Sequence, residues 1–116
     1  MVPIYRSDGE WVAVYEKKNL FNVDGEWIGF VVGRDVYDPS GSYLGYLSDD
    51  KRLLRARARP RNRPRIQPPA RPLRPDMPAT MPLAPMLAAL PFSEIDLFEE
   101  FPDRLSFVSD TRPDMD

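Results

Sequence analysis

Apolar and polar residues alternate in three short runs within the first fifty residues of the chain. The runs are WVAVY at 11–15, WIGFV at 27–31 and YLGYL at 43–47. A period of two, combined with β-branched and aromatic residues, is typical of β-strands. We therefore predict an all-β fold for this part of the chain, built from short strands.

The three runs belong to a repeat with a period of 16 residues. Each unit opens with an apolar–aromatic pair, and a second turn signal closes it, so the chain is predicted to form a meander of β-hairpins. Asp-Gly between two strands favours a type I′ turn, in which both central residues have positive φ. The first turn signal of each unit lies at Asp8-Gly9, Asp24-Gly25 and Ser40-Gly41.

A small residue recurs two places after the first aromatic residue of each run. It is Ala13, Gly29 or Gly45, and it predicts the close approach of another strand or ring. The whole unit resembles the four-fold β-flower domain of small bacterial proteins over about residues 3–54. That resemblance implies four hairpins arranged like petals around an axis, with a Pro-rich tail after them, and it implies no catalytic residue. It rests on Tyr5, Gly9, Val12, Ala13, Phe21, Gly25, Ile28, Gly29, Tyr37, Gly41, Leu44 and Gly45.

The fourth unit departs from the pattern. It is expected to open at residues 52–53, and Leu53 and Leu54 supply a first strand before arginines and alanines replace the repeat. Either the domain has three hairpins and one strand, or a closing strand comes from elsewhere. An unpaired edge strand invites strand addition by a partner. The chain's own tail can cover the edge as well, and we favour the tail.

Composition and charge divide the chain near residue 55. All six glycines precede this point, and the formal net charge of −2 separates into three blocks. Residues 1–50 carry four basic and nine acidic side chains. Residues 51–75 carry ten basic side chains and no acidic ones. Residues 76–116 carry two basic and nine acidic side chains. We predict four parts: a β-hairpin-repeat domain at 1–55, an Arg/Pro-rich extended linker at 56–91, a short docking helix with an apolar segment at 92–108, and a polar C-terminus at 109–116.

The basic linker is predicted to stay extended, because like charges repel and proline disfavours helix. Its positive charge favours an acidic protein surface, this chain's own acidic block included, or a polyanion. Residues 51–75 could bind an anionic membrane or nucleic acid. No aromatic residue interleaves with the arginines, however, so bases would have no ring to stack on in this segment. The predicted contact residues are Arg55, Arg57, Arg59, Arg61, Arg63 and Arg65.

The acidic and apolar residues after Pro91 predict a short amphipathic helix. Ser93 and Asp96 resemble a capping box, and Pro102 ends the run. Such a short helix is not stable alone, so it either docks in a groove of a partner, which we favour, or folds back on the β domain. The predicted partner-binding residues are Phe92, Ile95, Leu97, Phe98, Phe101, Leu105 and Phe107.

The chain has neither histidine nor cysteine, which removes the commonest general base and the soft metal ligands. We expect no enzymatic activity, cofactor, metal or small-molecule substrate. The function predicted is a linker, scaffold or assembly subunit that docks on a larger protein complex, by analogy with small linkers of bacterial assemblies such as light-harvesting complexes. The alternative is a nucleic-acid-associated accessory protein that uses the arginines. Without a signal peptide or membrane-span pattern, we expect it in the cytoplasm, alone or peripheral to a membrane-associated complex.

Overall fold

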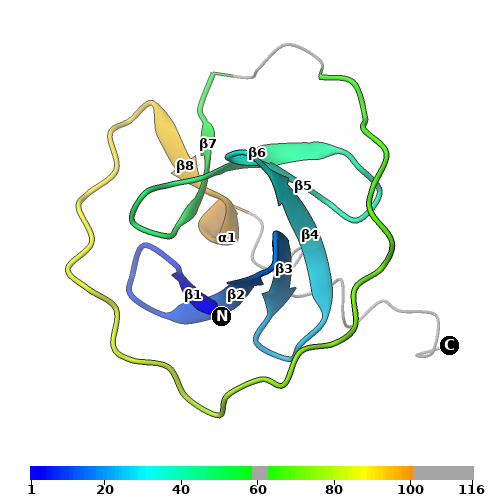
Figure 1. Ribbon diagram of the computed structural model, residues 1–116. Helices are drawn as coiled ribbons and strands as arrows, with labels where there is room; N and C mark the ends of the chain where they lie inside the picture. The colour runs from blue at the N-terminus through cyan, green and yellow to red at the C-terminus, as the bar shows by residue number, and fades with distance from the viewer. Residues whose placement is uncertain (59–62, 101–116) are drawn as a thin grey trace, which may run out of the picture.

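Eight antiparallel strands form one sheet in which every strand pairs with its neighbours in the chain. The sheet is strongly curled into a half-barrel, and one short helix follows it (Figure 1). This computed structural model describes residues 1–58 and 63–100. The predicted all-β meander is confirmed. The elements are β1 (Val2–Tyr5), β2 (Trp11–Glu16), β3 (Asn19–Asn22), β4 (Trp27–Val32), β5 (Asp35–Tyr37), β6 (Tyr43–Leu47), β7 (Leu53–Ala56), β8 (Glu94–Asp96) and α1 (Leu97–Glu100).

The strands form four hairpins, which we call petals 1 to 4 in chain order. In the first three petals the apolar–aromatic opening pair faces the aromatic start of the next strand, and the register shifts at that point. Because the same shift recurs, the sequence repeat is also a repeat of backbone geometry. The equivalent cross-strand pairs are Tyr5 with Trp11, Phe21 with Trp27 and Tyr37 with Tyr43.

The turn inside each of these petals is a three-residue loop. In petal 1, the N–H of Gly9 donates to the carbonyl of Arg6 at 2.8 Å, and the N–H of Arg6 donates to the carbonyl of Glu10 at 2.8 Å. Only the glycine has positive φ, so the predicted type I′ turn is wrong here. The geometry is that of a type I turn followed by a left-handed residue, which is the usual three-residue hairpin loop. The φ values are 93° at Gly9, 84° at Gly25 and 93° at Gly41.

The tight two-residue loop occurs instead between petals 1 and 2. Glu16 pairs with Asn19, and the two residues between them, Lys17 and Lys18, have φ of 50° and 68°. Positive φ at both positions is the requirement of a type I′ turn. Lysine does not normally signal this turn. The sequence pattern therefore predicted the type I′ turn in the wrong loop, at the glycine turn inside each petal.

The chain's own tail supplies the missing strand of petal 4, as favoured from the sequence. Leu54 pairs with Asp96, and Ala56 with Glu94, so β8 covers the edge of β7. The petal opens one residue later than expected, at Leu53, which pairs with Leu47. The turn between β6 and β7 is longer than the equivalent turns between petals 1 and 2 and between petals 2 and 3. Its additional residue moves the start of petal 4 by one position.

The predicted helix is largely replaced by this strand. Residues 94–96 pair with β7, which satisfies backbone groups that a helix at this place would leave open on the sheet edge. The helix that remains is α1, with four residues. Its cap is Asp96 rather than Ser93, because the N–H of Phe98 donates to Asp96 Oδ1 at 2.9 Å.

The core lies where the opening strands of the four petals meet. Their equivalent aliphatic residues are buried, and Leu97 and Phe98 complete the cluster at 2% and 5% exposure. The tail is therefore part of the folding unit rather than an appendage. The buried cluster comprises Ile4, Ala13, Leu20, Ile28, Val31, Val36, Leu53, Leu97 and Phe98.

Two of the recurrent small residues are required by close backbone approach. A Cβ placed on Gly29 would lie 2.4 Å from the carbonyl oxygen of Tyr37, and one on Gly45 would lie 2.1 Å from that of Leu54. No real Cβ contact is this short, so a side chain at either position would separate the two strands. The predicted close approach is confirmed.

Candidate functional site

Most of the connection between β7 and β8, from residue 63 to residue 93, runs around the outside of the sheet and returns to petal 4 (Figure 1). We call its residues 63–93 the strap. It contains no helix and no strand, and its prolines fix φ at values that suit an extended backbone. The strap is thus an insertion in the turn of the fourth hairpin, displayed on the rim of the domain.

The strap passes close to the glycine turn of each of the other petals. At petal 3 the N–H of Ile66 donates to the carbonyl of Gly41 at 3.1 Å, and a Cβ on Gly41 would lie 1.9 Å from the carbonyl oxygen of Ile66. These glycines therefore have two roles. They adopt the positive φ that the hairpin loops require, and the absence of a side chain leaves space for the strap. The strap reaches these turns in reverse petal order: Ile66 bonds to Gly41, Arg74 donates to the carbonyl of Asp24 beside Gly25, and Ala84 lies where a Cβ added to Gly9 would be 3.9 Å from its own.

Further polar contacts hold the strap near petals 1 and 4. Tyr5 Oη donates to the carbonyl of Pro82 at 2.6 Å. The N–H of Arg57 donates to the carbonyl of Ser93 at 2.7 Å, and the Arg57 guanidinium lies 3.9 Å from the ring centre of Phe92. The path of the strap is consequently fixed at several points, while its side chains remain outside the core.

Four large apolar side chains of the strap face solvent almost completely. By comparison, the exposed large apolar residues elsewhere in the described chain reach only 41–52% exposure. Single exposed apolar side chains are normal on a protein surface, but these four lie within one 20-residue stretch, and each is more exposed than any other large apolar side chain described. The exposed strap residues are Leu73 at 92%, Leu83 at 96%, Met86 at 100% and Phe92 at 79%.

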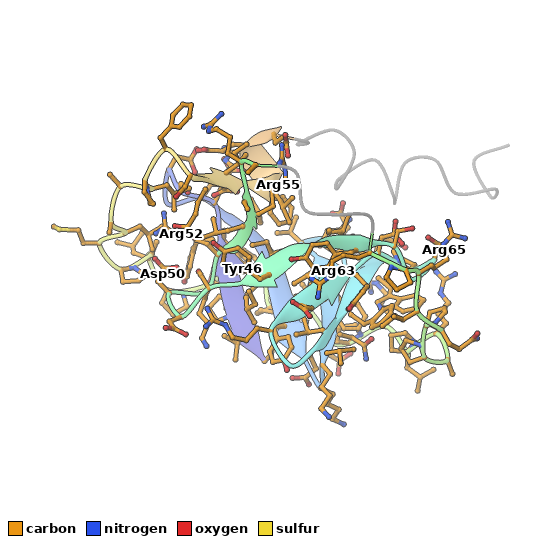
Figure 2. All side chains as sticks on the ribbon, turned by 90° about the horizontal axis from the view of Figure 1, so that it is seen from above. Tyr46, Asp50, Arg52, Arg55, Arg63 and Arg65 are labelled. Carbon is orange, nitrogen blue, oxygen red and sulfur yellow. The ribbon has the colours of Figure 1, made fainter. Side chains whose placement is uncertain are left out.

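Of the four described arginines that were proposed as polyanion contacts, three interact with this chain itself. Arg55 forms an ion pair with Glu100, which raises the pKa of Arg55. Arg63 pairs with Asp35 at 3.2 Å and lies over the ring of Tyr43. Arg57 contacts Phe92, Arg65 is exposed, and Arg59 and Arg61 lie outside the described residues. Figure 2 shows Arg55, Arg63 and Arg65 spread along the molecule rather than gathered in one patch.

The residues predicted to bind a partner through the C-terminal helix differ from one another in their burial. Leu97 and Phe98 are buried in the core, as expected if the segment folds back on the β domain. Their side chains are therefore not exposed to a partner. Ile95 is half-buried in β8, and of the four described residues of this set only Phe92 is exposed. Phe101, Leu105 and Phe107 lie outside the described residues.

A buried hydrogen-bond network joins petal 4 to petal 1. Ser7 donates to Asp96 Oδ2 from its backbone N at 2.8 Å and from Oγ at 2.6 Å. Arg52 donates to Ser7 Oγ at 3.1 Å and to Asp50 at 2.5 Å. Asp96 and Arg52 are 2% and 3% exposed. Because buried charges need such partners, the network is structural: side chains connect the two petals where no strand ladder does.

The network makes stability depend on pH in the acid range. The hydrogen bond from Arg52, and a second from Ser48, lower the pKa of Asp50. This carboxylate therefore adds stability above about pH 4, the usual value in an unfolded chain, and the gain is lost as pH falls through the folded pKa. We expect Asp50→Asn to reduce the acid dependence of the urea midpoint. Asp49→Asn is the control, since that side chain is 99% exposed, and an equal effect of both substitutions would contradict the assignment.

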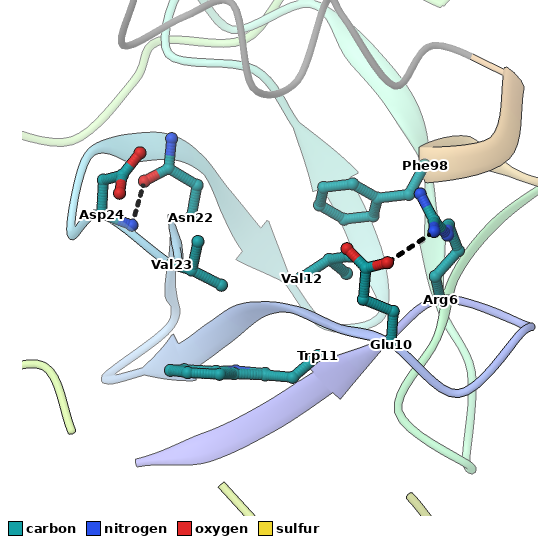
Figure 3. A pocket seen from close by; sticks show the side chains of 8 residues that line it. All are labelled: Arg6, Glu10, Trp11, Val12, Asn22, Val23, Asp24 and Phe98. Carbon is teal, nitrogen blue, oxygen red and sulfur yellow. Dashed lines mark hydrogen bonds and ion pairs between the residues drawn. The ribbon is translucent and has the colours of Figure 1, made fainter. Parts of the chain in front are cut away.

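A small pocket lies between the turns of petals 1 and 2 (Figure 3). Its volume is about 140 Å³, well below the roughly 300–1,000 Å³ of typical ligand sites. Arg6 and Glu10 form an ion pair of 2.8 Å at one side of it. We assign no function to this pocket. It is lined by Arg6, Glu10, Trp11, Val12, Asn22, Val23, Asp24 and Phe98.

Neither a metal centre nor a membrane-spanning helix is found in residues 1–58 and 63–100. No three acidic side chains converge there in a way that could hold a metal ion. The described helix is far too short to cross a bilayer. The exposed strap residues are thus the feature that most needs a functional explanation.

The curled meander with its repeated petals defines a β-hairpin-repeat protein. The chain matches the family model described as 4-fold beta flower protein over residues 2–101, and it belongs to that family. The match extends beyond the resemblance noted over residues 3–54 and includes the strap and β8. No curated protein and no solved structure matches the chain.

Sequence reasoning missed three of the four exposed strap residues, Leu73, Leu83 and Met86. A signal was present for Leu83 and Met86, because residues 77–91 are rich in methionine, leucine, alanine and proline and carry no charge. It carries no helical or strand period, so the sequence alone did not indicate whether these residues are buried.

Proposed function

We propose that this protein is a non-enzymatic binding subunit that docks on a larger protein complex through the exposed strap residues. The observation that carries this proposal is their exposure, from 79% to 100%. Each apolar side chain that a partner removes from water contributes to binding, at about 25 cal/mol per Å² of buried area. The curled sheet serves as the scaffold on which the strap is displayed.

The backbone of the strap supports the same proposal. Extended, proline-rich segments lose little conformational entropy on binding, because they already have the shape that a partner groove accepts. Anchoring at the glycine turns reduces that entropy loss further. A partner would therefore meet apolar side chains on a largely ordered backbone.

The strap is also longer than the fold requires. The N–H of Arg57 already bonds to the carbonyl of Ser93 at 2.7 Å, so the two ends of the connection are adjacent. A two-residue turn could join strands at this distance. The long excursion between these ends has no evident role in closing petal 4, which favours a role in binding.

Point substitutions on the strap test the proposal. We expect the double variant Leu83→Ser and Met86→Ser to reduce the amount of partner retained in a quantitative pull-down at least tenfold. Its thermal unfolding should not change, because both side chains are almost fully exposed. Val32→Ser is the matched control, since Val32 is an exposed apolar residue of β4.

Unchanged partner retention by the double variant would contradict a role for the strap. The nucleic-acid alternative predicts a different result. Binding would then be insensitive to the two serines and would fall steeply between about 50 and 200 mM salt, because phosphate contacts release counterions.

A further inference from the structure

We propose that the groove holding residues 94–100 is an exchangeable peptide-binding site, and that it accepts the same segment from a second copy of the chain. The inference is independent of the proposed function. It rests on how completely the groove recognises this short segment, and on how long the connection to it is.

Backbone pairing provides the first part of the recognition. Strand β8 adds to the edge of β7 through three residue pairs, Leu54 with Asp96, Arg55 with Ile95 and Ala56 with Glu94. Strand addition at a sheet edge is a common way to bind an extended peptide, because it requires no particular side chain. The segment therefore enters the sheet as a bound peptide would.

Two apolar side chains anchor the segment. Leu97 and Phe98 are 2% and 5% exposed, and both pack into the core cluster beside Leu53. Short peptides that bind specifically usually place such anchors in preformed pockets. No other residue of the strap or of the segment, among those described, is an apolar side chain buried to this degree.

Polar contacts define which peptide fits. The Asp96 carboxylate accepts two hydrogen bonds from Ser7, and Glu100 pairs with Arg55. A ligand must therefore present an acidic group before an aliphatic–aromatic pair and another acidic group two residues after that pair. The sequence from residue 94 to residue 100, EIDLFEE, has this pattern, and every second copy of the chain carries it.

The length of the connection makes exchange possible. Contacts between groove and segment are the same whether the segment comes from its own chain or from another, as in domain swapping. The closed monomer is favoured by the strap's own contacts with petals 1 to 3 and by the effective concentration of the tethered segment, which is on the order of millimolar while the strap is still unfolded and flexible. Refolding at a comparable protein concentration should therefore trap exchanged dimers.

The absence of native cysteines allows a direct test. One tagged copy carries Ala56→Cys and a second, differently tagged copy carries Glu94→Cys. These residues are ladder partners, so a disulfide between the two copies requires that one copy's segment occupies the other's groove. Both copies are refolded together at about 1 mM and then oxidised after dilution.

We expect a covalent heterodimer from this pair at a yield at least tenfold above that of a control pair, Lys17→Cys with Glu94→Cys. Lys17 lies in an exposed turn and does not pair with β8. Refolding at micromolar concentration should abolish the difference. Equal yields from the two pairs at high concentration, or no heterodimer from either, would overturn the proposal.

Discussion

Replacing Phe98 with alanine is expected to lower the free energy of unfolding by about 3–5 kcal/mol, the usual range for a buried phenylalanine. The ring is 5% exposed and belongs to the core cluster. Truncation would remove its buried surface and leave a cavity that the surrounding strands cannot fill. Urea unfolding followed by the fluorescence of Trp11 and Trp27 measures this change.

Phe92 provides the matched control. It lies in the same region of sequence, but its ring is 79% exposed and contacts only the guanidinium of Arg57 among the interactions described. An exposed contact of this type is worth about 0.5–1 kcal/mol, so Phe92→Ala should reduce stability by no more than that. Similar losses in the two variants would show that the tail is not part of the core.

Removing the strap is expected to preserve the fold and abolish partner binding. In this variant Asn-Gly replaces residues 58–92, which keeps the hydrogen bond between Arg57 and Ser93 and joins β7 to β8 by a type I′ turn. Shortening the loop reduces the entropy cost of closing it by about 2 kcal/mol. This gain offsets the loss of strap contacts such as that of Tyr5 with Pro82.

A cooperative urea transition and an unchanged β-type circular dichroism spectrum would confirm that the fold is retained. Loss of cooperative unfolding would show instead that the strap holds the petals together. The matched variant for binding is the double substitution Leu83→Ser and Met86→Ser, which keeps the strap in place but removes two of its exposed apolar side chains.

Three petals could be predicted from the sequence because local pattern and tertiary structure agree in them. Each has a period-two run, a glycine turn and a small residue where strands approach closely, as at Gly29 and Gly45. The details of the turns could not be predicted as well. A type I′ turn and a three-residue loop both use glycine, and they are distinguished by the pairing of Arg6 with Glu10 and by the positive φ at the glycine alone.

The fourth petal was harder because its two strands are far apart in sequence. The three residues of β8 are too few to show a strand period, while Ser93 and Asp96 imitate a helix start. Pairing with the open edge of β7 overrides this local preference. The same tertiary effect moves Leu97 and Phe98 from an expected docking surface into the core.

The exposure of the strap could not be deduced from sequence for a different reason. Its apolar residues have no period, so neither burial nor exposure follows from their spacing. The glycine turns at Gly9, Gly25 and Gly41 are far in sequence from the strap residues that lie beside them. Such long-range contacts leave no local signal in a single sequence.

Partner retention by the strapless chain shows whether the strap is the part of the protein that binds the partner. Intact and strapless proteins are used at equal amounts in parallel pull-downs from the source cells, and the retained proteins are quantified. We expect that partners held by the intact chain fall at least tenfold with the strapless chain, while both chains unfold cooperatively. Equal retention of the same partners by a folded strapless chain would contradict this expectation.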